Sequence, residues 1–163
     1  MLKISGRKIQ FGDGHKEAYA LLRTLWREET QKPFPEIAHT QRGKPYFVNE
    51  DIYFSVTHTK HHVFCAISDT PVGIDAEETD RQVNPALAQK VLSDGEYKQY
   101  LAAEDKNRAF LTLWVLKEAA AKCTGEGLQG YPNKTDFMLT DNRVKEIDGC
   151  LVAVIKEGDT NAF

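Results

Sequence analysis

The chain has 163 residues, of which 41% are hydrophobic and 28% are charged, and its formal net charge is −3. This length suits one domain, and the composition is that of an ordinary globular protein. The negative total and the lack of a basic block argue against a nucleic-acid or lipid-surface binder, so we expect neither nucleic acid nor membrane as a partner. No apolar run approaches the ~20 residues that span a bilayer.

The cysteines indicate a reducing compartment. The chain has three cysteines, Cys65, Cys123 and Cys150. An odd number at unrelated spacings is typical of buried thiols and not of a disulfide framework. The first residues also lack the apolar core and the cleavage site of a signal peptide. We therefore expect a cytoplasmic protein.

The first half of the chain predicts strands around one helix. Residues 2–11 alternate weakly and predict a strand, and residues 31–45 hold prolines and glycines that predict loop or short extended pieces. Residues 51–59 alternate between apolar and polar side chains and predict a strand, with Thr57 on the polar side. Residues 15–29 predict an amphipathic helix. Its apolar positions are Ala18, Leu21, Leu22, Leu25 and Trp26.

Two further strands and three helices are predicted next. Residues 61–69 predict a strand that is buried on both faces, and residues 71–78 a short strand after a Pro-Gly signal. The helices are predicted from their caps. These are Asn84 with Pro85 for the first helix, Ser93 with Glu96 as a capping box for the second, and Asn107 with Gly125 at the two ends of a long third helix.

The tail, residues 135–158, predicts two or three antiparallel strands with turns near Asp141 and Asp148. The predicted order of elements is strands with one helix, then helices, then strands. This order predicts an α+β fold. Both halves hold strands and a helix, so a duplicated, two-lobed arrangement is possible.

The stretch "GIDAEE" places two carboxylates on one strand face. Because side chains two apart in a strand point the same way, Asp75 and Glu77 share a face, with Ile74 and Ala76 on the other. Such a pair suits a hard divalent cation such as Mg²⁺. Taken alone, the pair is more often a solvated acidic turn.

The long helix carries charged residues among apolar ones. Trp114, Glu118 and Lys122 form one row, and Lys117 lies about 100° around the helix, where we expect a solvated edge. Glu118 and Lys122 could form a simple surface pair. However, the segment is apolar on nearly every side, which predicts burial, and buried charges need partners. A metal ion for Glu118 and a phosphate for Lys122 would supply them.

Two weaker signals accompany these motifs. Thr57 and His58 end a strand, and Lys44 stands between Gly43 and Pro45, which hold the backbone around a possible phosphate contact. A zinc cluster of the three nearby histidines is disfavoured because a fourth ligand is lacking. Of these histidines, His61 and His62 are predicted to be solvated turn residues.

In order, the motifs are G-K-P, F-S-V-T-H-T, G-I-D-A-E and W-x-x-K-E-A-x-x-K-x-x-G-x-G, over residues 43–128. This arrangement resembles the 4′-phosphopantetheinyl transferase superfamily, in its surfactin-synthetase-activating type with a shortened N-terminal half. The resemblance implies a two-lobed, pseudo-dimeric α+β fold of antiparallel strands packed with a long helix. Residues 1–72 would form an N-terminal lobe with coenzyme A contacts, and residues 73–163 a C-terminal lobe with the metal site and the catalytic helix.

The resemblance also implies an activity of the holo-[acyl-carrier-protein] synthase class. Such enzymes transfer the 4′-phosphopantetheine arm of coenzyme A to a serine of an acyl or peptidyl carrier protein and release adenosine 3′,5′-bisphosphate. Carried over by position, the Mg²⁺ ligands are Asp75, Glu77 and Glu118. The coenzyme A contacts are Lys44, Thr57, His58, Asp75 and Lys122. The catalytic residues are Glu118, as candidate general base, with Lys122 and His58.

Other readings stay open on the sequence. The shortened first half has no clear match to the basic residues that hold the 3′-phosphate of coenzyme A in larger relatives. The possible substitutes are Arg23, Arg27, Lys32 and Arg42. A non-catalytic coenzyme A or carrier-binding module and a Mg²⁺-dependent nucleotide pyrophosphohydrolase are the alternative functions. We expect a monomer, with a dimer as the alternative, and carriers of fatty-acid, polyketide or peptide synthesis are all compatible.

Overall fold

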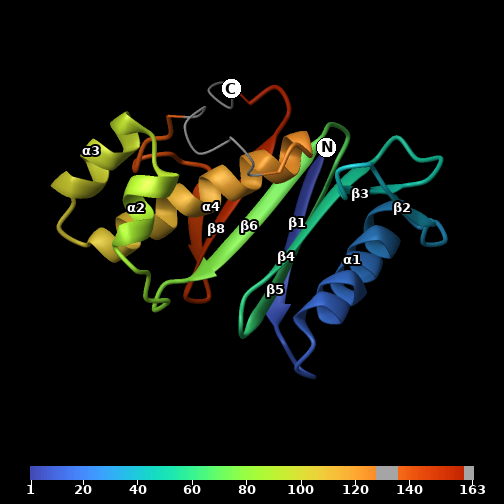
Figure 1. Ribbon diagram of the computed structural model, residues 1–163. Coiled ribbons are helices and arrows are strands. Elements are labelled where there is room, and N and C mark those ends of the chain that lie inside the picture. The colour runs from blue at the N-terminus through green and yellow to red at the C-terminus, as the bar shows by residue number, and fades with distance from the viewer. Residues whose placement is uncertain (128–135, 160–163) are drawn as a thin grey trace.

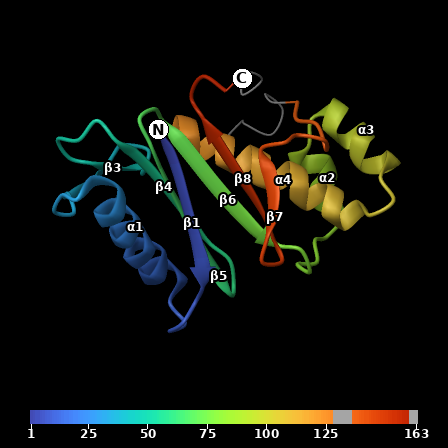
Figure 2. The ribbon, with the colours of Figure 1, turned by 180° about the vertical axis from the view of Figure 1, so that it is seen from behind.

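The computed structural model describes residues 1–127 and 136–159. Two residues at the ends of segments discussed above lie outside these ranges. They are Leu128, the last residue of the motif region 43–128, and Thr135, the first residue of the predicted tail. The described chain forms four layers in the order helix, sheet, sheet, helix (Figure 1). Figure 2 shows the same layers from behind, with the strands of the two sheets side by side.

The first sheet is antiparallel and has the strand order β1-β5-β4. Its strands are β1 (Leu2–Lys8), β4 (Tyr53–His58) and β5 (His62–Ser68). Its outer face is covered by α1 (Gly14–Thr30), in which all five predicted apolar positions are buried. Asp13 accepts a hydrogen bond from the Lys16 backbone N–H and so caps this helix. The predicted loop contains a small hairpin of β2 (Ile37–His39) and β3 (Pro45–Phe47).

The second sheet is also antiparallel, with the order β6-β8-β7. Its strands are β6 (Val72–Glu78), β7 (Val144–Ile147) and β8 (Cys150–Lys156). The long helix α4 (Lys106–Thr124) packs on β6 and β8, and α2 (Ala86–Val91) and α3 (Asp94–Ala102) lie beyond it. The fold class predicted from the sequence, α+β with antiparallel strands and a long helix, is confirmed.

Side-chain alternation explains how the sheets stack. In β5, Val63 and Ile67 join the core under α1, while Phe64 and Ala66 face the second sheet, so β5 is buried on both faces as predicted. In β6, Ile74 belongs to the same inter-sheet core. The opposite face of β6, which carries the two predicted carboxylates, is turned toward α4.

The predicted N-cap of the long helix is wrong. The structure places the N-cap of α4 at Asp105, whose side chain accepts the Arg108 backbone N–H, and not at Asn107. Asn107 instead accepts from the Val83 backbone N–H and donates to the Arg81 carbonyl, so it holds the loop after β6. Asp105 and Asn107 both have short side chains that can cap a helix, so the local sequence does not distinguish them. The contact of Asn107 with the distant loop after β6 leaves Asp105 as the cap.

The N-cap of α2 is Pro85 and not the predicted Asn84, although Asn84 Oδ1 accepts a hydrogen bond from the Ala86 backbone N–H. The remaining predicted caps are present. The capping box of Ser93 and Glu96 is present, and Gly125 ends α4 at a φ of 75°. The tail forms two strands joined by a turn at Asp148 and Gly149, both at positive φ. Within the described residues, no helix is long and apolar enough to cross a membrane.

Candidate active site

The backbone of α4 lies directly on β6 at Gly73. A Cβ atom built at Gly73 would be 1.9 Å from the carbonyl oxygen of Ala119, so a larger residue would push the helix away. Only glycine permits this approach. The contact brings the next two side chains on this face of β6, Asp75 and Glu77, against the row of Trp114, Glu118 and Lys122 on α4.

Asp75 is buried between the two sheets and the helix. Its Oδ1 atom accepts a hydrogen bond from Thr57 Oγ1 at 3.2 Å and from Lys122 Nζ at 2.7 Å. Lys122 also donates to the Ile74 carbonyl at 3.1 Å. Burial raises the pKa of Asp75, and the Lys122 ammonium opposes that rise.

Glu77 is half-buried and forms an ion pair with Arg81. The indole of Trp114 lies near the Glu77 carboxylate and lowers its pKa. Burial raises the pKa of Glu77, and Asp75 adds to the rise while Arg81 opposes it. No local pattern marks Arg81 as a site residue. It follows β6 in a loop, where two residues four apart do not necessarily point the same way.

Glu118 carries a strongly perturbed carboxyl group. Desolvation by burial, followed by repulsion from Asp75, raises the pKa of Glu118 to about 7. Lys122 and Arg81 lower it and Glu77 raises it further. Strong perturbation of neighbouring acidic groups in a hollow is typical of functional sites.

The three carboxylates line one cavity of ≈ 400 Å³. Thr57, His58 and Lys122 line it as well. A second cavity of ≈ 400 Å³ shares Glu118 and Lys122 with the first and extends to the hairpin. The residues that line it there include His39, Arg42 and Lys44. The structure thus brings all the predicted site residues to two adjoining hollows.

The predicted metal ligands do not yet converge on one point. Among the described residues, one oxygen taken from each of these three carboxylates does not give three atoms that all lie within 4.8 Å of one another. Lys122 instead binds Asp75 and Arg81 binds Glu77. The donor set still fits a hard divalent cation, since three carboxylates face two cationic side chains and the pKa of each carboxyl is raised.

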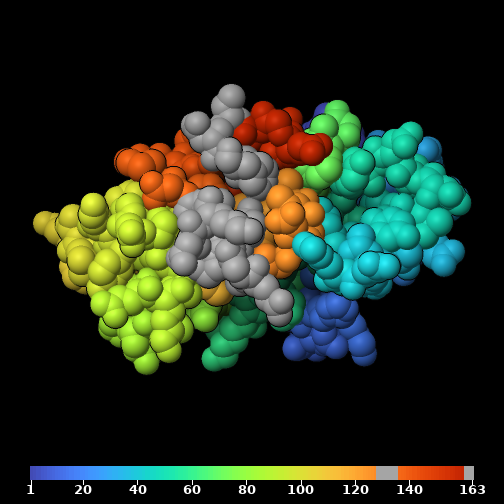
Figure 3. Space-filling view, turned by 45° about the horizontal axis from the view of Figure 1, so that its top comes forward, coloured from blue at the N-terminus to red at the C-terminus, as the bar shows by residue number. Residues whose placement is uncertain are grey.

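Lys44 lies where the hairpin meets the end of α4. Its Nζ donates a hydrogen bond to the Cys123 carbonyl, and its stem lies against Gly125. Figure 3 shows this segment (cyan) reaching the C-terminal end of α4 (orange). Burial lowers the pKa of Lys44. Of the four basic candidates for the 3′-phosphate, Arg42 alone lines the hairpin cavity, while Arg23 stacks on Phe34.

The prediction for Lys117 is wrong. Its side chain is 0% exposed and pairs with the equally buried Glu96 at 2.8 Å. Glu96 Oε1 also accepts the Phe137 backbone N–H at 3.0 Å. This pair joins α3, α4 and the segment after residue 135, and no local pattern predicts a partner 21 positions away.

The prediction for His62 is also wrong. His61 is exposed as expected, but His62 is 7% exposed and lies between the sheets. His58 is exposed beside Gly14 at the start of α1, and among the described residues it does not form a group of close metal-ligand atoms with His61 and His62.

Comparison with known proteins agrees with the motifs. The family model described as "4′-phosphopantetheinyl transferase superfamily" matches residues 71–155, which include β6, α4 and β8. This is more than half of the chain. The chain belongs to the 4′-phosphopantetheinyl transferase superfamily, as the sequence analysis predicted.

Superfamily members from several bacteria are similar to the chain. The 4′-phosphopantetheinyl transferase gsp of Aneurinibacillus migulanus is 34% identical over 107 residues, which are 64% of this chain and 44% of that protein. The transferase psf-1 of Bacillus pumilus is 34% identical over 66% of this chain and 48% of its own length. Sfp of Bacillus subtilis (strain 168) is 34% identical over 53% and 39%. The chain therefore matches about half the length of these relatives.

Proposed function

We propose that the protein transfers the 4′-phosphopantetheine arm of coenzyme A to a serine hydroxyl of an acyl or peptidyl carrier protein and releases adenosine 3′,5′-bisphosphate. The observation that carries this proposal is the meeting of Asp75, Glu77, Glu118 and Lys122 in one cavity that adjoins a second, basic cavity. The names of the relatives support it.

The metal ligands are Asp75, Glu77 and Glu118. When bound, Mg²⁺ would offset the charge of the coenzyme A pyrophosphate and of the leaving group. The raised pKa values of all three carboxyls support such a site. Burial is the main cause of each rise, and Asp75 adds repulsion at Glu77 and Glu118, so a bound cation would offset both the lost solvation and this repulsion. Lys122 and Arg81 would then be released in part from their present ion pairs.

Coenzyme A would lie across the two cavities. Lys122 lines both, so its ammonium can contact the pyrophosphate, with Thr57 and His58 beside it in the first cavity. Lys44 and Arg42 line the second cavity, where we place the adenine end and the 3′-phosphate. Charge-assisted hydrogen bonds from such groups hold phosphates firmly.

Glu118 is the proposed general base for the carrier serine. An ordinary carboxylate is a weak base at neutral pH. Without a bound cation the pKa of Glu118 is about 7, which matches the working range of a general base, and a cation would lower that pKa. Glu118 also lines both cavities, so it is near the point where the pyrophosphate and an incoming hydroxyl would meet.

We further propose that residues 1–72 and 73–163 act as two lobes of one active unit. Side chains from both ranges line each cavity, which supports a functional monomer. Free, buried Cys65, Cys123 and Cys150 support a reducing, cytoplasmic location.

The test incubates the protein with coenzyme A, Mg²⁺ and several apo carrier proteins and follows the carrier mass. We expect each accepted carrier to gain one phosphopantetheinyl group, and Glu118→Ala to lose transfer while it retains coenzyme A binding. Binding without transfer would favour the non-catalytic module. Release of phosphopantetheine without any carrier would favour the pyrophosphohydrolase.

A further inference from the structure

A second cluster of potential ligands lies on the other face of β6. Strand alternation turns Glu77 toward α4 and Glu78 toward the first sheet, on the side of Ile74 and Ala76. Glu78 therefore stands at the end of the inter-sheet core, on the face of β6 opposite to Glu77.

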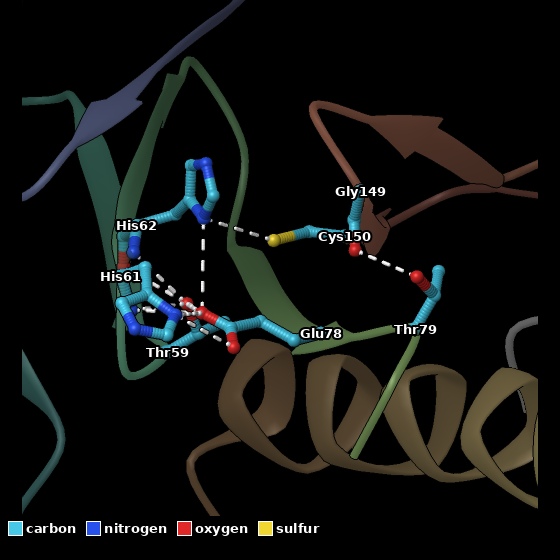
Figure 4. A network of polar contacts seen from close by, with 7 residues as sticks. All are labelled: Thr59, His61, His62, Glu78, Thr79, Gly149 and Cys150. Carbon is cyan, nitrogen blue, oxygen red and sulfur yellow. Dashed lines mark hydrogen bonds and ion pairs between the residues drawn. The ribbon is translucent and has the colours of Figure 1, made fainter.

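Three strands meet at this point, and each contributes one ligand type (Figure 4). His62 begins β5, Glu78 ends β6 and Cys150 begins β8. The His62 Nδ1 atom lies 3.4 Å from Cys150 Sγ and 3.8 Å from Glu78 Oε1, and the ligand atoms of all three residues lie within 4.8 Å of one another. His62 is 7% exposed and Cys150 is 0% exposed.

These separations match those of a tetrahedral metal site. Bonds of about 2.3 Å to sulfur and about 2.0–2.1 Å to nitrogen or oxygen, at tetrahedral angles, separate S from N by about 3.6 Å and N from O by about 3.3 Å. The observed 3.4 Å and 3.8 Å are close to those values, so an ion would need only small side-chain movements.

The surroundings of Glu78 supply a fourth ligand and orienting groups. His61 Nδ1 lies 3.0 Å from both Glu78 oxygens, and its side chain is 60% exposed. His61 lies outside the group of atoms within 4.8 Å of one another, so its ring would have to turn away from Glu78 to bind the ion. Thr59 Oγ1 donates to Glu78 Oε1 at 2.8 Å and fixes the carboxylate. His61 and Glu78 also line a surface cavity of ≈ 280 Å³, which gives an ion a path to the site.

We propose that His62, Glu78 and Cys150, with His61 as fourth ligand, bind a borderline-soft divalent cation such as Zn²⁺. A mixed set of imidazole, carboxylate and thiolate favours zinc over Mg²⁺, which prefers oxygen ligands alone. The Cys150 thiol would lose its proton to water as the sulfur–metal bond forms, because the thiolate is the ligand. The proposal is independent of the transferase activity.

The ion would link the two sheets. β5 belongs to the first sheet, whereas β6 and β8 belong to the second. Binding would therefore stabilise the packing between the sheets, and it would hold the end of β6 next to Glu77. An ion that binds only the folded state raises stability by mass action.

The test titrates the full chain with Co²⁺ in place of Zn²⁺ and records absorption. Cobalt bound to a thiolate has a charge-transfer band in the near ultraviolet, so we expect this band to saturate at one equivalent. Cys150→Ala should lose the band and weaken Zn²⁺ binding by more than about 100-fold, since even outer contacts of a metal site change affinity 10- to 100-fold. Cys65→Ala is the matched control, because Cys65 is also 0% exposed and lies outside the cluster.

Further variants separate this site from the proposed active site. Glu118→Gln should keep the cobalt–thiolate band. Glu78→Gln should weaken the band, and this variant still tests the site if Cys150→Ala does not fold. Absence of the band in the natural chain, or equal Zn²⁺ affinity in Glu78→Gln and the natural chain, would overturn the proposal.

Discussion

Replacing Glu118 by glutamine should stabilise the protein at neutral and higher pH. The pKa of Glu118 is raised from its ordinary value of 4.5 to about 7, first by burial and then by Asp75. Between pH 4.5 and about pH 7, the folded state therefore keeps the Glu118 proton, whereas the unfolded state has released it. The natural chain loses stability as the pH rises through this window, whereas the glutamine variant has no proton to lose at this position.

The size of the effect follows from the displacement of the pKa. Moving a pKa from 4.5 to about 7 corresponds to about 3 kcal/mol at ~1.4 kcal/mol per unit. Glu118 is only partly buried, and solvent screening reduces the expected gain to about 1–2 kcal/mol. We expect no gain from this source below about pH 4.5 and the full gain above pH 7.

The assay is urea unfolding of both proteins at several pH values between 4.5 and 8.5 without divalent cations. The difference in the free energy of unfolding should grow with pH and then level off. Glu126→Gln is the control, because Glu126 is exposed just beyond α4, and it should show no such trend. A difference that does not depend on pH, or a less stable glutamine variant at pH 8, would refute the proposed cause of the raised pKa.

Three further predictions test other parts of the structure. Gly73→Ala should destabilise the protein by more than about 2 kcal/mol in urea unfolding, because its Cβ would overlap the Ala119 carbonyl; a loss below 0.5 kcal/mol would show that α4 can shift freely. Lys117→Ala should cost about 3–5 kcal/mol by leaving Glu96 buried without its cation, and an unchanged midpoint would contradict this role. Arg42→Ala should weaken coenzyme A about tenfold in calorimetric titration and leave 3′-dephospho-coenzyme A unaffected. Equal weakening of both ligands would exclude a contact with the 3′-phosphate.

Local patterns predicted much of the candidate site. The period of two in β6 correctly puts Asp75 and Glu77 on one face, and the period of 3.6 correctly aligns Glu118 and Lys122 on α4. The order of the motifs then indicated the family. These features follow from residues close in the sequence, so the sequence alone carries them.

Contacts between distant residues explain what the sequence could not show. Lys117 looked like an edge residue because its partner Glu96 lies on another helix, and His62 looked solvated because Cys150 is 88 positions away. The ion pair of Arg81 with Glu77 likewise depends on the path of a loop. In each case tertiary packing decides where the side chain lies.

We propose above that Asp75, Glu77 and Glu118 hold a divalent cation against the pyrophosphate of coenzyme A. The most direct measurement is phosphorus NMR of coenzyme A bound to the protein, with Mn²⁺ in place of Mg²⁺, because a paramagnetic ion broadens only nearby nuclei. We predict strong broadening of the pyrophosphate signals that is lost in Asp75→Ala while coenzyme A remains bound. Equal broadening with the natural chain and the variant would contradict the claim.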